Sequence, residues 1–428
     1  MEAVKNNKML ISAFIIAAIL ITVTFPDEGV EIQKTIISKF HMKVVIAVGA
    51  VFLSYYVTRN PKRKPQPIVS FSDTLKMKAM LIRSYGTHRM EIGTMPRPKV
   101  TKPYDVLIKV KAASLNPIDF RVKEWYGQEL LKKRREMMGF SNSFPIVVGR
   151  DCSGEVVEVG SHVSQFKPGD EVWASGSIFH TPGTLAQYFL TSDQLISKKP
   201  TNIGHIEAAS LPYVITTSWQ AFLKAGINAT TAKGKRVLIL AGTGGVGSFA
   251  IQILKAWGCH VTTTCSADGI EMVKRLGADR AIDYKKESLV AAVEDKEKFD
   301  FVFCTRGGDD TYKTCLAVCR PGGCVVTIVT PVVRNLDKYG YILGTIKNFI
   351  DILKYRHFQK WMYNKDFRYS FHEPDGPFLQ EVAELVEAGK VKGCIDRSYE
   401  FVRTNEALEK LKEGHARGKF VVSVPQDE

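Results

Sequence analysis

C-x-x-C pairs are absent from this 428-residue chain, which has eight cysteines. The three that lie nearest one another in sequence, Cys315, Cys319 and Cys324, have no matching Cys or His pair to complete a zinc module. This absence argues against a structural zinc site. Several cysteines stand instead in apolar surroundings, where a free thiol acts as a small hydrophobic side chain, and the pattern indicates a reducing compartment.

Acidic residues are also fewer than basic residues. Lys and Arg number 59 against 44 Asp and Glu, which leaves a net charge of +15 and a pI of about 9.3. Such a balance suits nucleic acid, an anionic membrane surface or a mitochondrial interior, or it simply keeps the surface soluble. No nucleic-acid-binding module is recognisable, so no nucleic-acid partner is expected. The hydrophobic fraction of 45% is ordinary and predicts a globular body with a buried core.

Two apolar runs near the N-terminus approach the length of a membrane span. Residues 9–25 carry no charge and would cover roughly 25 Å as a helix, which is the short end of a membrane span. Residues 44–57 form a shorter run with basic residues on both sides. Three prolines between residues 61 and 67 then stiffen the segment that follows the second run.

Three interpretations of this N-terminal segment compete. A secretory signal would need small residues at a cleavage site, where the chain has Phe25-Pro26. A mitochondrial presequence would be amphipathic and free of acids, whereas this segment is more apolar and contains Asp27, Glu28 and Glu31. A membrane anchor fits best, either as one span or as a hairpin of two with its basic ends on the cytosolic side.

The body of the chain changes in character twice, which predicts two domains of different class. From Lys76 onward, short strands separated by turns alternate apolar and polar residues, as over 105–111. After Glu207, uninterrupted apolar strands alternate with helices, which is typical of a parallel sheet covered on both faces. Near the C-terminus a polar strand, a charged helix and a last strand are predicted to return to the first domain. The expected division is an anchor or targeting segment and linker at 1–75, a β-rich catalytic domain at 76–205, a Rossmann domain at 206–364, and a return segment at 365–428.

The stretch RVLILAGTGGVGSFAIQ, at 236–252, joins an apolar strand to a helix through a glycine-rich turn. Backbone N–H groups and the helix dipole make such a turn a binding site for an anion. Gly244 would let a pyrophosphate approach the backbone, and Gly247 would let the helix pack closely on the strand. Because the turn follows a strand and opens a helix within a βαβ unit, it predicts a dinucleotide cofactor.

The end of the second strand of this unit favours NADPH over NADH. NAD-selective folds usually end that strand with Asp or Glu, which bonds the ribose 2′-hydroxyl. Here it ends Thr262-Thr-Thr-Cys-Ser266, without an acid. A hydroxyl can bind a 2′-phosphate that a carboxylate would repel, so Ser266 is expected to be a ligand. Asp268, two residues further on, is an acid and therefore weakens the preference for NADPH.

Several stretches, in this order, resemble the zinc-independent medium-chain dehydrogenases/reductases, in particular their quinone-oxidoreductase-like branch. They cover most of residues 76–428 and read AASLNPIDFRVKEWYG (112–127), FPIVVGRDCSGEVVEVG (144–160), FKPGDEVW (166–173), AASLPYVITTSW (208–219), AGTGGVG (241–247), LGADRAIDY (276–284) and GHARGK (414–419).

The resemblance implies an α/β fold with a GroES-like catalytic domain and a Rossmann doubly wound parallel sheet. It implies cofactor contacts from the glycine-rich turn, two strand ends and the return segment: Thr243, Gly244, Gly245, Val246, Gly247, Ser266, Tyr284, His415, Ala416 and Arg417. For Tyr284 the alternative is a packing role at a strand end, and for His415 and Arg417 it is an exposed turn.

The resemblance also implies that no metal is bound. Zinc-dependent relatives have a Cys at the position of Asn116 and a His-Glu pair at the positions of Arg150-Asp151, and Asn and Arg are poor zinc ligands. Mitochondrial members of the branch further imply a mitochondrial location, a link to ubiquinone metabolism and redox balance, a reticulon-type partner protein and a homodimer. Combined with the anchor, these features favour the outer membrane over the matrix.

Without a metal to polarise a carbonyl, hydride transfer to an electron-poor acceptor is expected, namely a quinone or an α,β-unsaturated carbonyl. The catalytic candidates are Asn116 as a donor to the acceptor oxygen, Tyr126 as a proton source, and Asp119. A turn role in Asn-Pro-x-Asp is the alternative for Asp119. The alternative functions are a 2-alkenal or enoyl reductase and a membrane-tethered NADPH-binding interaction protein with little turnover.

Deletion of residues 1–64 should release the protein from membranes, because both apolar runs and their basic flanks are removed with them. We expect the full chain to remain in the pellet after carbonate extraction and the shortened chain to move to the supernatant. Retention of the shortened chain in the pellet would refute the anchor.

Overall fold

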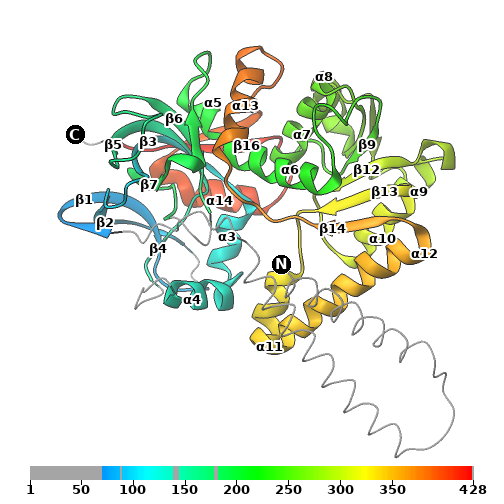
Figure 1. Cartoon of the computed structure of the whole chain (residues 1–428), viewed down its shortest axis with the longest axis horizontal. Coiled ribbons are helices and arrows are strands. Elements are labelled where there is room, and N and C mark those ends of the chain that lie inside the picture. Colours follow the sequence, from blue (N-terminus) through cyan, green and yellow to red (C-terminus); the bar gives the residue numbers. More distant parts are fainter. Residues whose placement is uncertain (1–69, 87–88, 138–143, 178–181, 427–428) are drawn as a thin grey trace, which may run out of the picture.

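The computed structural model describes residues 70–86, 89–137, 144–177 and 182–426, with the side chains of 133–137 excepted. A β-rich unit and a parallel-sheet unit lie side by side in this part of the chain (Figure 1). The apolar runs at 9–25 and 44–57, which carry the anchor prediction, lie outside the described residues. Among the helices that are described, none combines the length and hydropathy needed to cross a bilayer.

The β-rich unit is built on a seven-stranded sheet and a smaller sheet of three strands. The large sheet has the order β15-β16-β3-β5-β6-β8, and β7 pairs with β3. Its strands are β3 (Asp105–Leu115), β5 (Asp151–Val159), β6 (Glu171–Ser175), β7 (Tyr188–Ser192), β8 (Ile196–Lys198), β15 (Ile395–Glu400) and β16 (Lys419–Ser423). The small sheet joins β1 (Ser70–Ile82), β2 (Glu91–Lys99) and β4 (Ile146–Val147). The helices of the unit are α3 (Pro117–Lys123), α4 (Gln128–Met137), α5 (His205–Ala209) and α14 (Thr404–Lys412).

Strand β3 is more deeply buried than its alternating sequence predicts. Val106 and Ile108 point into the main core of the unit, as expected of a strand with one buried face. Leu107, on the opposite face, is also fully buried, because it packs against Met77 and Ala79 of the small sheet. The small sheet therefore covers the face that the pattern assigns to solvent.

The second unit is a six-stranded sheet in which all paired strands run parallel. The order β11-β10-β9-β12-β13-β14 is the 3-2-1-4-5-6 arrangement of dinucleotide-binding folds. The strands are β9 (Arg236–Ile239), β10 (His260–Cys265), β11 (Arg280–Asp283), β12 (Phe299–Cys304), β13 (Cys319–Thr327) and β14 (Asp366–Tyr369). The helices are α6 (Pro212–Ala225), α7 (Gly245–Ala256), α8 (Ile270–Arg275), α9 (Leu289–Ala292), α10 (Asp309–Val318), α11 (Val332–Ile352), α12 (Gln359–Tyr363) and α13 (Gly376–Glu387). The predicted α/β fold, with a GroES-like unit and a Rossmann-like sheet, is thus confirmed.

The central strand β9 shows why the strands of this sheet are apolar throughout. Val237 and Ile239 pack in one core, together with residues of α6, α7 and α13. Leu238 and Leu240 pack in a second core on the other face, with residues of α10 and β14. Because helices cover both faces (Figure 1), the positions from Val237 to Leu240 all hold apolar side chains.

The chain returns to the β-rich unit through its last strands. In β16, Phe420 pairs antiparallel with Leu115 of β3, and β15 adds to the outer edge of β16. The predicted return segment starts at 365, but β14 pairs with β13 and completes the parallel sheet. Phe367 of β14 is fully buried there, so β14 belongs to the parallel sheet and not to the return segment.

Candidate active site

A cleft of about 740 Å³ lies between the two units. The β-rich unit contributes the end of β3, the start of α3 and the return segment before β16. The parallel sheet contributes the glycine-rich turn and the carboxyl ends of β10, β12 and β13. All ten predicted cofactor residues line it: Thr243, Gly244, Gly245, Val246, Gly247, Ser266, Tyr284, His415, Ala416 and Arg417.

The glycine-rich turn has the close approaches that a phosphate-binding turn requires. A Cβ atom on Gly247 would lie 2.3 Å from the carbonyl oxygen of Ala241, so only glycine lets α7 start this close to β9. Gly244 is the N-cap of α7 and forms an isolated β-bridge with Gly418 of the return segment. The turn therefore presents the start of a 12-residue helix to the cleft and fits a pyrophosphate.

The outer end of the cleft carries an exposed cluster of three polar side chains. The hydroxyl of Ser266 donates a hydrogen bond to Asp268, and Arg417 forms an ion pair with the other oxygen of that carboxylate. These contacts, first the one with Ser266 and then the one with Arg417, lower the pKa of Asp268. Tyr284 lies at the same end with 47% of its surface exposed. A hydroxyl and a guanidinium thus already hold an anionic group where the sequence predicts the 2′-phosphate.

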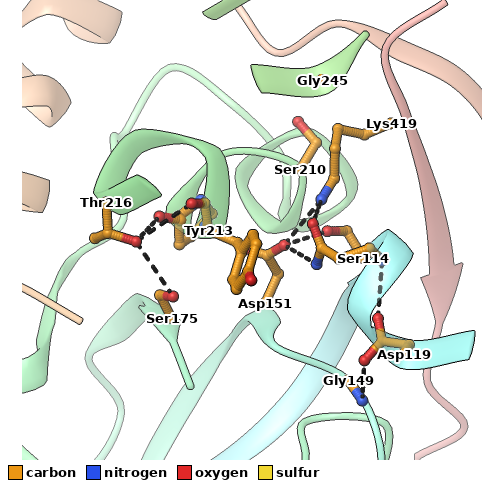
Figure 2. A network of polar contacts seen from close by, with 12 residues as sticks. Ser114, Asp119, Gly149, Asp151, Ser175, Ser210, Tyr213, Thr216, Gly245 and Lys419 are labelled. Carbon is orange, nitrogen blue, oxygen red and sulfur yellow. Dashed lines mark hydrogen bonds and ion pairs between the residues drawn. The ribbon is translucent and has the colours of Figure 1, made fainter. Parts of the chain in front are cut away.

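The inner end of the cleft is a buried network centred on Asp151 (Figure 2). One carboxylate oxygen accepts hydrogen bonds from Ser114 Oγ at 2.6 Å and Asn116 Nδ2 at 2.8 Å, and lies 3.0 Å from Lys419 Nζ. The other accepts a hydrogen bond from the backbone N–H of Tyr213. Asp151 is fully buried and Lys419 is 5% exposed. The network joins β3, β5, α6 and β16 at one point.

The three predicted catalytic residues occupy different surroundings. Asn116 and Tyr126 line the cleft. The carboxylate of Asp119 accepts hydrogen bonds from the backbone N–H groups of Asn116, at 2.8 Å, and Gly149, at 3.0 Å, and it is not among the lining residues. This geometry favours the turn alternative for Asp119, which fastens the first turn of α3. Burial raises the pKa of Tyr126, so its phenol stays protonated near neutral pH.

A second buried cation, Arg150, lies close to the network. Its side chain is almost fully buried, and burial lowers its pKa while the charge of Asp119 raises it. His372 stacks on Tyr213 with a ring separation of 4.1 Å and contacts Thr216 Oγ1 at 2.9 Å. Burial, with Arg150 and Lys419 nearby, lowers the pKa of His372 to about 3. This ring is therefore neutral across the physiological range.

Sequence patterns alone did not single out three residues of the cleft: Tyr213, His372 and Lys419. Lys419 is the last residue of the GHARGK stretch and the first residue of an apolar strand. This position is the one feature of the sequence that could have marked it as a candidate site residue. His372 stands in no motif and was not detectable. Across the described ranges, no group of three or more His, Cys, Asp or Glu side chains is placed to hold a metal ion.

Two protein-family models match the chain. One, described as the alcohol dehydrogenase GroES-like domain, matches residues 102–201. The other, described as a zinc-binding dehydrogenase, matches residues 276–422. The two matches fall on the β-rich unit and on the later part of the parallel-sheet unit with its return strands.

Similar proteins have oxidoreductase names. The chain is 40% identical over 357 residues to "NAD(P)H oxidoreductase RTN4IP1, mitochondrial" of Homo sapiens, which covers 81% of this chain and 89% of that protein. It is 36% identical over 344 residues to "Reticulon-4-interacting protein 1, mitochondrial" of Caenorhabditis elegans, over 78% of this chain and 92% of that protein. The solved quinone oxidoreductase from Coxiella burnetii has a TM-score of 0.67 and 30% identity, over 82% of this chain and 100% of that chain.

The neutral ring of His372 predicts a loss of stability in mild acid. A histidine in the unfolded chain gains a proton near pH 6.5, whereas the folded one stays neutral down to about pH 3. Because the folded pKa is the lower one, the free energy of unfolding falls as pH drops from 6.5 towards 3, by at most about 1.4 kcal/mol per pH unit. Denaturant unfolding of the His372→Gln variant between pH 6.5 and 5 should show a shallower slope than the wild type. Equal slopes for the wild type and His372→Gln would contradict the assignment.

Proposed function

Because the chain belongs to the medium-chain dehydrogenase/reductase family and is an NAD(P)H oxidoreductase within it, we propose that it transfers hydride from NADPH to a quinone-type acceptor. The observation that carries the proposal is the cleft, in which a phosphate-binding turn lies between an exposed cationic end and a buried polar end. A dinucleotide bound across the turn would reach both ends.

The outer end supports NADPH as the cofactor. Ser266 and Arg417 are a hydroxyl donor and a guanidinium, the groups that recognise a 2′-phosphate. In the structure the carboxylate of Asp268 contacts both of them. We propose that the phosphate displaces Asp268 and takes over its two partners, with Tyr284 and His415 beside it.

The inner end supports an acceptor with a conjugated carbonyl. The cofactor supplies the hydride when bound, and the chain must place the acceptor, exclude water and provide a proton. Asn116 lies at the bottom of the cleft, 2% exposed, and Tyr126 is a protonated phenol on its wall. We propose that Tyr126 or water completes the reaction by protonating the reduced acceptor.

The same end supports catalysis without zinc. Asn116 and Asp151 bind the ammonium of Lys419, and the neighbouring Arg150 is a second buried cation. A divalent metal placed among these groups would face two positive charges, and the nearby carboxylates Asp151 and Asp119 already interact with Lys419 and Arg150. The donor set therefore does not fit a zinc site.

Location and partners follow from the relatives and the N-terminal sequence. The relatives named above are called mitochondrial, and one is named as a reticulon-interacting protein. We propose a mitochondrial, membrane-anchored protein, with the outer membrane favoured over the matrix, a role in ubiquinone metabolism, a reticulon-type partner and a homodimer as its assembly.

Substitutions at the outer end should shift the choice of cofactor. Asp268→Asn removes a carboxylate that competes with the 2′-phosphate, so affinity for NADPH should rise about fivefold while affinity for NADH does not. Ser266→Asp adds a repulsive charge and should lower NADPH affinity about tenfold relative to NADH. Cofactor fluorescence titration measures both dissociation constants.

Asp295→Asn is the matched control, since Asp295 is also an exposed aspartate in an ion pair but lies outside the cleft. It should change neither constant. An NADPH preference that Ser266→Asp leaves unaltered would contradict the proposed 2′-phosphate site.

An acceptor panel tests the reaction itself. The full chain, solubilised in detergent, should oxidise NADPH with a soluble ubiquinone analogue, followed by loss of absorbance at the reduced nicotinamide band. A 2-alkenal of similar size, tested in parallel, identifies the enoyl reductase alternative if it is turned over faster. Tight NADPH binding without oxidation by either acceptor would favour the interaction-protein alternative.

A further inference from the structure

We propose that the ammonium group of Lys419 binds the carbonyl oxygen of the acceptor and stabilises the negative charge that forms there. This inference rests on the proposed hydride transfer and adds to it a residue in direct contact with the reacting group. The acceptor class it implies is a compound with an oxygen conjugated to the reduced carbon, such as a quinone or an enone.

The first support is the position of Lys419. It is the first residue of β16 and lines the cleft, together with Asn116 and Tyr213. Its stem passes beside the glycine-rich turn, since a Cβ atom on Gly245 would lie 2.5 Å from Lys419 Cδ. The ammonium therefore lies at the inner end of the same cleft in which the cofactor's phosphates would meet the turn (Figure 2).

The second support is the hydrogen-bond inventory of the ammonium. Its described hydrogen bonds are to Asn116 Oδ1 at 2.5 Å and Asp151 Oδ2 at 3.0 Å, and the centre of the Tyr213 ring lies 6.0 Å away. An ammonium group has three N–H donors, so the two hydrogen bonds leave one for a ligand. The two contacts also hold the group in place, which is what a pre-organised donor to a developing oxyanion requires.

The third support is a comparison with Asn116, the donor predicted from the sequence. The amide of Asn116 is neutral, its oxygen accepts from Lys419 and one of its N–H groups donates to Asp151. A buried ammonium is the stronger partner for an oxyanion, because charge-assisted hydrogen bonds are roughly twice as strong as neutral ones. Asn116 is thereby assigned to positioning Lys419.

Asp151 holds the ammonium without cancelling its action on a ligand. Its carboxylate accepts hydrogen bonds from Ser114, Asn116 and the backbone of Tyr213 in addition to Lys419. Its charge is therefore shared among four donors rather than paired with the lysine alone. A carbonyl oxygen arriving from the cleft would meet the remaining N–H of Lys419 in a water-poor setting, where such a contact is stronger than in water.

The step is balanced as follows. The acceptor carbon gains a C–H bond by accepting hydride from the reduced nicotinamide, the conjugated π electrons move to the carbonyl oxygen, and that oxygen becomes an oxyanion bound to Lys419. From an enone, one proton from Tyr126 or water then gives the saturated carbonyl compound. From a quinone it gives a keto tautomer, whose C–H proton moves to the second oxygen to form the hydroquinone. Two electrons are transferred in either case.

A charge-compensated pair of variants tests the proposal. Lys419→Met alone leaves Asp151 buried without its cation and is expected to destabilise the protein. The double variant Asp151→Asn/Lys419→Met removes both charges. We expect it to bind NADPH within about threefold of the wild type, because no contact at the outer end changes, and to lose about 100-fold in kcat with the ubiquinone analogue. Recovery of wild-type kcat in the double variant would show that Lys419 serves only to neutralise Asp151.

Binding of a charged product mimic gives a readout that needs no turnover. We expect the wild-type protein loaded with NADP⁺ to bind 4-nitrophenolate at least about tenfold more tightly than 4-nitroanisole, and the double variant to lose this preference. An equal preference in the two proteins would overturn the assignment. If the wild type prefers the phenolate and the double variant does not, but the wild type reduces neither acceptor, the oxyanion site stands and the proposed reaction fails.

Lys199 provides the matched control. It is another buried lysine, 8% exposed and in an ion pair with Glu171, but it lies outside the cleft. Lys199→Met should lower the unfolding temperature without changing kcat or the preference for phenolate. A loss of phenolate preference in this variant as well would mean that the effect reports general destabilisation, and the proposal would be overturned.

Discussion

The buried ion pair between Lys419 and Asp151 is the contact on which the arrangement of the cleft depends. Removing a charge from water costs several kcal/mol even after relaxation, so a buried pair is stable only where further hydrogen bonds complete its geometry. Ser114, Asn116 and the backbone of Tyr213 supply these bonds. Four elements from both units must meet for the pair to form. The network thus ties the return strand β16 to β3, β5 and α6.

The return strand in turn brings the segment before it across the glycine-rich turn. Gly418 bridges Gly244, and Arg417 reaches Asp268 at the outer end of the parallel sheet. One short segment therefore places a buried lysine at the inner end of the cleft and an exposed arginine at its outer end. The two ends differ in solvent: charges at the outer end are screened, while those at the inner end act with little screening.

Most of the sheet was predictable because its strands are bounded by turns and buried on both faces. The apolar run at the start of RVLILAGTGGVGSFAIQ forms strand β9 (Arg236–Ile239), as the sequence predicts. Strand β2 gives no clear strand pattern, because its sequence EIGTMPRPK contains two prolines and few apolar residues, which a sheet tolerates at an edge. Strand β14 was assigned to the wrong unit because four residues do not reveal which sheet they join.

The sequence by itself determined the glycine-rich turn at the start of α7 and the nicotinamide class of the cofactor. These features are local, since a glycine at the start of a helix acts through its own backbone and needs no distant partner. Only the tertiary structure decided what the polar side chains do. Lys419 meets Asp151 across 268 positions of sequence, Arg417 meets Asp268 across 149, and Asp119 bonds the backbone of Gly149. Charge pairing and burial are long-range properties of the folded chain, because they depend on which strands the return segment joins.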